Sequence, residues 1–167
     1  MPSFTPLREI IPRAELKRLL SQDYCELEPD FLCFEPAYQA VAKYVPKDYI
    51  IVDCGCYLAL QAYLFREHRR YIGIDCLEKQ QLFQNLERAS TANSLMLSTR
   101  VQDMRSWFWQ GERLYVMAVA VPDREVQEAV RRMPNHFLWY PGTPADVQGV
   151  FARDIQDVFM EYMRERQ

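Results

Sequence analysis

The stretch that decides the fold is residues 49–60, which read YIIVDCGCYLAL. Its first half is apolar and rich in β-branched residues, as expected for a strand buried on both faces. The run then meets Asp53, and Gly55 follows two residues later. A glycine directly after a buried strand permits a positive φ angle and lets a ligand approach the backbone closely. The stretch therefore predicts a buried strand followed by a turn that either binds a ligand or only keeps the shape of such a turn.

The composition predicts a single globular domain. Of the 167 residues, 49% are hydrophobic and 26% are charged, which is not typical of a disordered chain. The formal charge of −3 predicts no general attraction to nucleic acid or to anionic lipid. No apolar run approaches the roughly 20 residues of a membrane helix, and the first residues lack the apolar core of a signal peptide. We therefore expect a cytoplasmic protein without membrane contacts.

The cysteines indicate reduced thiols rather than disulfides or a metal site. Their number is odd and no two have C-x-x-C spacing. Cys54 and Cys56 could take part in binding a soft metal, but no histidine lies near them in the sequence. Small thiols buried at the end of the strand are the simpler explanation, and we expect no metal. The five cysteines are Cys25, Cys33, Cys54, Cys56 and Cys76.

After residue 48, short apolar runs alternate with amphipathic helices. Strands buried on both faces, each followed by a helix, predict an α/β fold with a mostly parallel sheet and helices on both faces. Right-handed crossovers would make this sheet open and doubly wound. The expected strands are residues 49–54, 71–76, 94–103, 113–121 and 135–140, and the expected helices between them are residues 58–68, residues 78–89 and a helix capped by Asp123.

The regions before and after the sheet are predicted to be helical. Pro12 begins a helix with Leu16, Leu19 and Leu20 on one face, and Pro36 opens a second helix that ends at Pro46. After the sheet, Thr143 is expected to cap one long helix whose apolar stripe includes Val147, Phe151, Ile155, Val158, Phe159 and Tyr162. The expected single domain, residues 1–167, thus has N-terminal helices in 1–45, a core sheet in 49–140 and a C-terminal helix in 143–167.

The order of elements, with IVDCGCYLA and YIGID, resembles the class I S-adenosylmethionine-dependent methyltransferases. In that family the first strand ends in an acidic residue followed by alternating glycines. Asp53 and Gly55 match, whereas Tyr57 and Ala59 stand where two further glycines are usual. Asp75 ends the second strand at about the twenty-residue separation expected of a nucleotide-binding unit. The resemblance covers roughly residues 34–140 and implies a five-stranded sheet in the order 3-2-1-4-5.

The resemblance also implies where a cofactor, S-adenosylmethionine, would bind. Asp53, Gly55 and Tyr57 would lie at the turn, Asp75 would hold the ribose hydroxyls and Asp103 would meet the adenine amino group. Simpler roles remain open, because each aspartate could also cap a turn or a helix. Tyr57 would either form a wall of the site or fill space that the ligand would need.

No catalytic residue is assigned. Amino-methylating relatives often carry an acidic or amide residue, two prolines and an aromatic residue after strand four; here Pro122 and Asp123 match poorly, and Asp123 is expected to be a helix cap. We expect His68 to be solvated among arginines, and His136 to lie at the amino end of the sheet, away from the site. Several aromatic residues could stack on a ligand, bind a protein or pack in the core: Trp107, Phe108, Trp109, Trp139 and Tyr140.

The end of the chain departs from the family pattern. A complete class I domain usually adds a β-hairpin after strand five, whereas this sequence predicts only a helix. That edge of the sheet would then be covered by the helix or by a second copy of the chain. Three functions therefore stay open. The chain could transfer the sulfonium methyl group to an unknown acceptor, or it could be a non-catalytic relative that binds a protein partner and whose Tyr57 fills the cleft. It could also be another nucleotide-binding α/β protein, such as a dinucleotide binder, whose glycine pattern fits less well.

Overall fold

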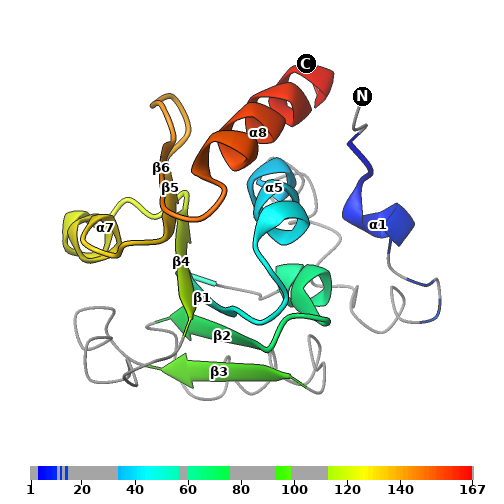
Figure 1. Ribbon diagram of the computed structural model, residues 1–167, viewed down its shortest axis with the longest axis horizontal. Helices are drawn as coiled ribbons and strands as arrows, with labels where there is room; N and C mark the ends of the chain where they lie inside the picture. Colours follow the sequence, from blue (N-terminus) through cyan, green and yellow to red (C-terminus); the bar gives the residue numbers. More distant parts are fainter. Residues whose placement is uncertain are drawn as a thin grey trace.

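The computed structural model describes residues 4–10, 12, 14, 34–56, 60–75, 93–98 and 113–166. Helices and strands alternate along much of this chain, and Figure 1 shows their arrangement. In chain order the elements are α1 (Leu7–Ile10), α5 (Glu35–Tyr44), β1 (Ile50–Cys54), the 3-10 helix η1 (Leu60–Phe65), β2 (Arg70–Asp75), β3 (Ser94–Ser98), β4 (Leu114–Val119), α7 (Arg124–Arg131), β5 (His136–Trp139), β6 (Asp146–Gln148) and α8 (Ala152–Arg166). In the described part of the chain, no helix has both the length and the apolar character needed to cross a membrane.

The described strands form one sheet in the order β3-β2-β1-β4-β5-β6. Strand β1 is parallel to both β2 and β4, and the pairs β2–β3 and β4–β5 are also parallel. Strand β6 pairs with β5 in the antiparallel direction. The sheet therefore differs from the expected order 3-2-1-4-5 by one strand, which extends it beyond β5.

The central strands are buried on both faces, as their apolar runs predict. All five residues of β1 are buried. Ile51 belongs to an apolar cluster that includes residues of α5 and α8, whereas its neighbours Ile50 and Val52 belong to a second cluster with Val130 of α7. Because side chains alternate along a strand, these clusters lie on opposite faces of the sheet, with α7 on the other side from α5 and α8 (Figure 1). The helix expected over residues 78–89 lies outside the described residues.

Helix α5 confirms the helix expected after Pro36. Pro36 lies in its first turn, where a missing N–H costs nothing, and the backbone N–H of Val45 closes the last turn on Val41 O at 2.9 Å. The N-terminal segment lies against this helix, because Leu7 N donates to the buried Glu35 Oε2 at 3.0 Å. Leu16, Leu19 and Leu20, expected on an earlier helix, lie outside the described residues.

The helix expected over residues 58–68 is wrong in length and type. The described part of that segment is the short 3-10 helix η1, after which His68 N donates to Phe65 O at 3.0 Å. The tight turn brings the buried Phe65 ring parallel to that of Tyr71 on β2, with 5.7 Å between their centroids. His68 is also buried rather than solvated, with Nε2 2.9 Å from Val45 O.

The expected helix start at Thr143 is wrong as well. The Thr143 hydroxyl instead donates to Tyr140 O at 2.6 Å in a turn, and β6 follows this turn. Gly149 and Phe151, with φ angles of +92° and +50°, then redirect the chain into α8. The edge of β5 is thus covered by a strand of the same chain, rather than by the helix or by a second copy. The later part of the predicted stripe is confirmed by the burial of Ile155, Val158, Phe159 and Tyr162.

Candidate functional site

The carboxyl ends of β1 and β2 lie next to each other at the same end of the parallel strands. We call this end of the sheet the carboxyl edge. In open α/β sheets, ligands bind beyond this edge. The turn after β1 is tied to the end of β2, because Gly55 N and Cys56 N both donate to Ile74 O, at 2.7 and 3.1 Å. This pair of hydrogen bonds places Gly55 beside Asp75, the last residue of β2.

Gly55 adopts a φ angle of +76°, which other residues rarely adopt. A Cβ atom built at this position would lie only 2.6 Å from Cγ2 of Val121, which follows β4. The glycine is therefore required for two reasons, its backbone conformation and its contact with the loop after β4. That contact also means that Val121, rather than open space, occupies one side of the glycine.

Asp53 is completely buried and both of its carboxyl oxygens are engaged. The hydroxyl of Tyr38, on α5, donates to Oδ1 at 3.2 Å, and the hydroxyl of Tyr71, on β2, donates to Oδ2 at 2.5 Å. Burial raises the pKa of Asp53 to about 7; the two phenol hydrogen bonds oppose that rise, and the charge of Asp75 adds to it. The carboxyl group of Asp53 therefore titrates near neutral pH.

The partners of Asp53 were not predicted from the sequence. Tyr38 and Tyr71 lie in apolar stretches where an aromatic residue is expected to pack, and nothing local indicates that their hydroxyls share one carboxyl group. The available signal was a phenol at the start of YIGID, with no further polar side chain between it and Asp75. Burial and the nearby Asp53 raise the pKa of both phenols, so they remain protonated donors.

Cys54 and Cys56 are buried thiols that form no disulfide, in agreement with the small buried thiols predicted at the end of the strand. Burial, followed by the charge of Asp53, raises the pKa of each, so both remain protonated and are poor nucleophiles and poor metal ligands. In the described ranges, no three histidine, cysteine, aspartate or glutamate side chains are grouped so that they could hold a metal ion.

Of the remaining residues predicted to lie at the site, some are described by the structure and some are not. Asp75 is partly exposed at the end of β2, where a ligand can reach it. Tyr57 and Asp103 lie outside the described residues, as do Trp107, Phe108 and Trp109. Trp139 is buried and packs edge-on against Phe159, with ring centroids 5.0 Å apart, so it belongs to the core.

The loop after β4 holds no catalytic group among its described side chains. Asp123 caps α7, because its Oδ1 accepts from Glu125 N at 2.8 Å and from Val126 N at 3.4 Å. This confirms the predicted cap. The side-chain amide of Gln127 donates to Val121 O at 2.8 Å and thereby fixes the loop over Gly55.

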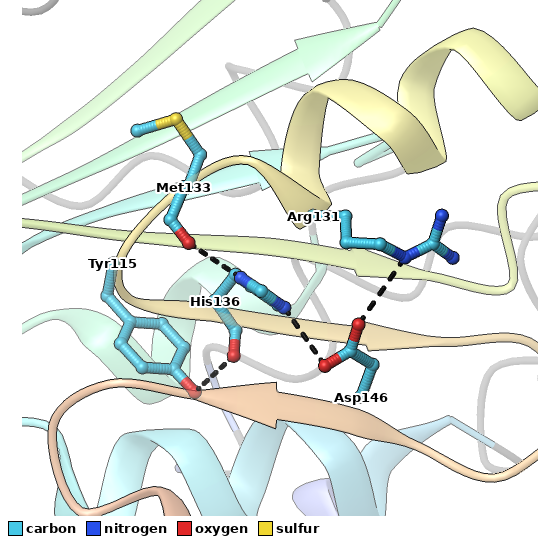
Figure 2. Close-up of polar contacts among 5 residues, drawn as sticks. All are labelled: Tyr115, Arg131, Met133, His136 and Asp146. Carbon is cyan, nitrogen blue, oxygen red and sulfur yellow. Dashed lines mark hydrogen bonds and ion pairs between the residues drawn. The ribbon is translucent and has the colours of Figure 1, made fainter.

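A second polar cluster lies at the start of β5 and was missed by sequence reasoning. Figure 2 shows Asp146 of β6 between His136 and Arg131. The buried His136 donates from Nδ1 to Met133 O at 2.7 Å, while its Nε2 lies 3.2 Å from Asp146 Oδ1 without the alignment of a hydrogen bond. Arg131 Nε lies 3.5 Å from the other carboxylate oxygen. The cluster holds the hairpin and the end of α7 together, at the amino end of β5.

The comparisons with known proteins identify the fold. No protein-family model matches the sequence, and no curated protein matches it either. Among solved structures, the plantazolicin methyltransferase BamL, in complex with a triazolic desmethylPZN analog and SAH, is 9% identical with a TM-score of 0.50. That match covers 95% of this chain and 70% of the BamL chain.

Two further solved structures match less of the chain. An rRNA methylase from Streptococcus thermophilus is 12% identical with a TM-score of 0.49, and the match covers 61% of this chain and 66% of that one. The bifunctional kinase-methyltransferase WbdD is 12% identical with a TM-score of 0.45, and the match covers 62% of this chain and 26% of WbdD. This chain thus spans about two thirds of the methylase chain, and much less of WbdD. Together with the sheet order, the BamL match shows a class I methyltransferase-like fold.

Two described residues near the turn have the properties that a nucleoside site on its β2 side would require. Gly55 allows a ligand to approach the backbone, and the partly exposed carboxylate of Asp75 can accept hydrogen bonds from ribose hydroxyls. Asp53 fits a direct contact less well, because it is fully buried and hydrogen-bonded by two phenols. Its effect on a ligand would therefore be electrostatic.

Proposed function

We propose that this chain binds S-adenosylmethionine or S-adenosylhomocysteine at the carboxyl edge of its sheet and acts as a methyltransferase-like protein. The observation that carries this proposal is the turn at Gly55, whose positive φ angle and hydrogen bonds to Ile74 O place it beside the partly exposed Asp75. A glycine turn and an acidic residue at the next strand end are the two features that a nucleoside-binding α/β sheet needs.

Each of the residues predicted to contact the cofactor has a distinct role in this proposal. Gly55 lets the ligand lie against the backbone, and Asp75 orients the ribose by accepting its two hydroxyl protons. Asp53 contributes negative charge from beneath the turn. Tyr57 would form a wall of the site, and Asp103 would accept from the adenine amino group; both roles rest on the family resemblance.

When bound, S-adenosylmethionine supplies an electrophilic methyl group on its sulfonium. The contribution of the chain would be to orient the nucleoside, since methyl transfer depends mainly on holding an acceptor in line with that group. Among the described residues we assign no general base at the carboxyl edge. The acceptor, whether small molecule, protein or nucleic acid, is left open.

Calorimetric titration of the purified chain tests the proposal directly. We expect S-adenosylmethionine and S-adenosylhomocysteine to bind, and Asp75→Ala to weaken both by about tenfold or more, because the ribose hydroxyls lose their acceptor. Asp157→Ala is the matched control, since it removes an exposed aspartate from α8 and should leave binding unchanged. No heat and no melting shift at millimolar ligand, for either compound, would refute cofactor binding.

A second function, a non-catalytic interaction module, is favoured by two contacts. Val121 occupies one side of Gly55, and the phenols of Tyr38 and Tyr71 engage the carboxyl group of Asp53. Both contacts stabilise the turn without a ligand. In this alternative the chain keeps the fold and binds a protein partner through its surface. The same titration separates the two functions, because the module would bind neither compound.

A further inference from the structure

We infer that ligand binding at the carboxyl edge is coupled to proton release, because Asp53 loses its proton when a positively charged ligand binds. The site should therefore prefer S-adenosylmethionine to S-adenosylhomocysteine more strongly as the pH rises. The inference rests on the proposed function and specifies how the site would be regulated. The step is balanced by the release of one proton to solvent as the sulfonium cation binds. No bond other than the O–H bond of the carboxyl group is broken.

The geometry of the cluster allows Asp53 to hold or to lose this proton without rearrangement. Tyr38 of α5 and Tyr71 of β2 place one hydroxyl on each carboxyl oxygen, at 3.2 and 2.5 Å. A phenol can donate to a carboxylate and can accept from a carboxylic acid, so the same two partners serve both protonation states. Since Asp53 is completely buried, its charge is not shielded by water and acts strongly on its surroundings.

The described groups around Asp53 offer it no positive charge. On β4, its neighbour in the sheet register is the apolar Met117. No base is among the described groups that act on its pKa, which burial raises to about 7. Ionising Asp53 would add a second negative charge close to Asp75, and a cationic ligand would offset that charge. The titratable groups around Asp53 are Tyr38 of α5, Tyr71 and Asp75 of β2, and the thiols of Cys54 and Cys56.

The two ligands differ in the charge on their sulfur atom. S-adenosylmethionine carries a sulfonium charge that S-adenosylhomocysteine lacks, whereas their nucleoside parts are the same. Below the pKa of Asp53, binding of the cation must expel a proton; above it, the carboxylate is already charged. The affinity for S-adenosylmethionine should therefore rise with pH and level off, while the affinity for S-adenosylhomocysteine should change little.

The test is calorimetric titration of the full chain with each compound at about pH 6 and about pH 8. Each titration is run in two buffers that titrate near the chosen pH, phosphate and bis-Tris at the lower pH and phosphate and Tris at the higher pH, because their different ionisation enthalpies reveal the number of protons released. We expect S-adenosylmethionine to bind about three- to tenfold more tightly at the higher pH. We also expect it to release a measurable fraction of a proton at the lower pH. S-adenosylhomocysteine should show less than about a twofold change and almost no proton release.

Three variants assign the effect to Asp53. Asp53→Asn should remove the pH dependence and the proton release while still binding ligand. Tyr71→Phe removes a hydrogen bond that lowers the pKa of Asp53, so the midpoint of the affinity change should move to higher pH. Asp48→Asn is the control: it neutralises an exposed aspartate just before β1, at the opposite end of the same strand, and should behave like the wild type.

The outcomes separate this inference from the function on which it rests. Binding of S-adenosylmethionine with equal affinity at both pH values and without proton release would overturn the inference and leave the proposed function intact. Absence of binding by either compound would overturn both. If Asp53→Asn does not fold, the proton count of the wild-type protein and the shift in Tyr71→Phe decide the matter.

Discussion

Asp53 should make the stability of the protein depend on pH even without a ligand. Folding raises the pKa of this group from 3.8 to about 7, mainly by burial. Below about pH 4 both the folded and the unfolded chain hold the proton; between about pH 4 and 7 only the folded chain does. Its contribution to the free energy of unfolding therefore falls as the pH rises through this range, by up to roughly 4 kcal/mol, and is level above it.

We predict that in Asp53→Asn the free energy of unfolding falls less steeply as the pH rises. Urea unfolding at about pH 5 and about pH 8 measures the difference for each protein, because other groups that titrate contribute equally to both. Asp48→Asn should keep the wild-type slope, since that exposed carboxylate forms only a surface ion pair with Arg113. An equal slope in Asp53→Asn and in the wild type would contradict the assignment.

Alanine substitutions at two glycines can separate the energetic cost of backbone strain from the cost of a steric clash. Alanine at this position must adopt a φ angle of +76° and place its Cβ 2.6 Å from Val121 Cγ2. Gly142 has a similar φ angle of +88°, but no atom lies within 4 Å of a Cβ built there. We predict that Gly142→Ala costs about 1 kcal/mol in the free energy of unfolding and Gly55→Ala about 2–4 kcal/mol.

The steric part of that cost can be removed by a second change. Val121→Ala deletes the methyl group that the new Cβ meets, so Gly55→Ala should be less costly in a Val121→Ala background than in the wild type. The double-mutant cycle, measured by urea unfolding, should give a favourable coupling of about 1 kcal/mol or more. Purely additive effects would indicate that Val121 does not lie over the turn.

The elements divide into those that the sequence determines locally and those that it does not. Apolar runs predicted the strands β1, β2, β4 and β5, because strands buried on both faces show no alternation and stand out as continuous runs. Strand β6 has only three residues, too few for any period, and Thr143-Pro144 before it imitates a helix start. What selects the strand is pairing with β5, a contact that no local pattern contains.

The hairpin that β6 forms should depend on Asp146. Its carboxylate lies beside the buried His136 ring and beside Arg131, as Figure 2 shows. Asp146→Ala removes the carboxylate that lies beside both side chains, and we predict a loss of about 1–2 kcal/mol in the free energy of unfolding. Arg131→Ala is the control: this exposed pair spans 3.5 Å, and its loss should cost about 0.5 kcal/mol or less. Equal losses in a urea titration would show that the histidine contact contributes nothing.

Across the molecule, sequence spacing predicted where the acidic residues lie in the sheet but not which residues they contact. The separation of Asp53 and Asp75 along the chain predicted that two acidic residues would end neighbouring strands, and the parallel pairing of β1 with β2 confirms it. The phenols that engage Asp53 come from α5 and β2, and Val121 comes from the loop after β4. These contacts depend on how distant segments pack, which spacing along the chain does not determine.

We predict that Tyr57 decides whether the carboxyl edge can bind a ligand. This residue stands where relatives carry a second glycine, and a tyrosine adds a whole ring to a turn that a ligand must approach. If the ring narrows the site, Tyr57→Gly should bind S-adenosylmethionine about tenfold more tightly than the wild type, or should bind it where the wild type does not. Calorimetric titration of both proteins measures this change.

Tyr57→Phe is the matched control for that experiment, because it keeps the ring and removes only the hydroxyl. It should bind S-adenosylmethionine as the wild type does if bulk is what limits access. A loss of binding in both variants would mean that the phenol hydroxyl contacts the ligand, and a loss in Tyr57→Gly alone would mean that the ring forms a wall of the site. Unchanged binding in Tyr57→Gly would contradict obstruction. The interaction module would then have to keep its carboxyl edge closed by other contacts, and among the described residues the packing of Val121 over Gly55 is one such contact.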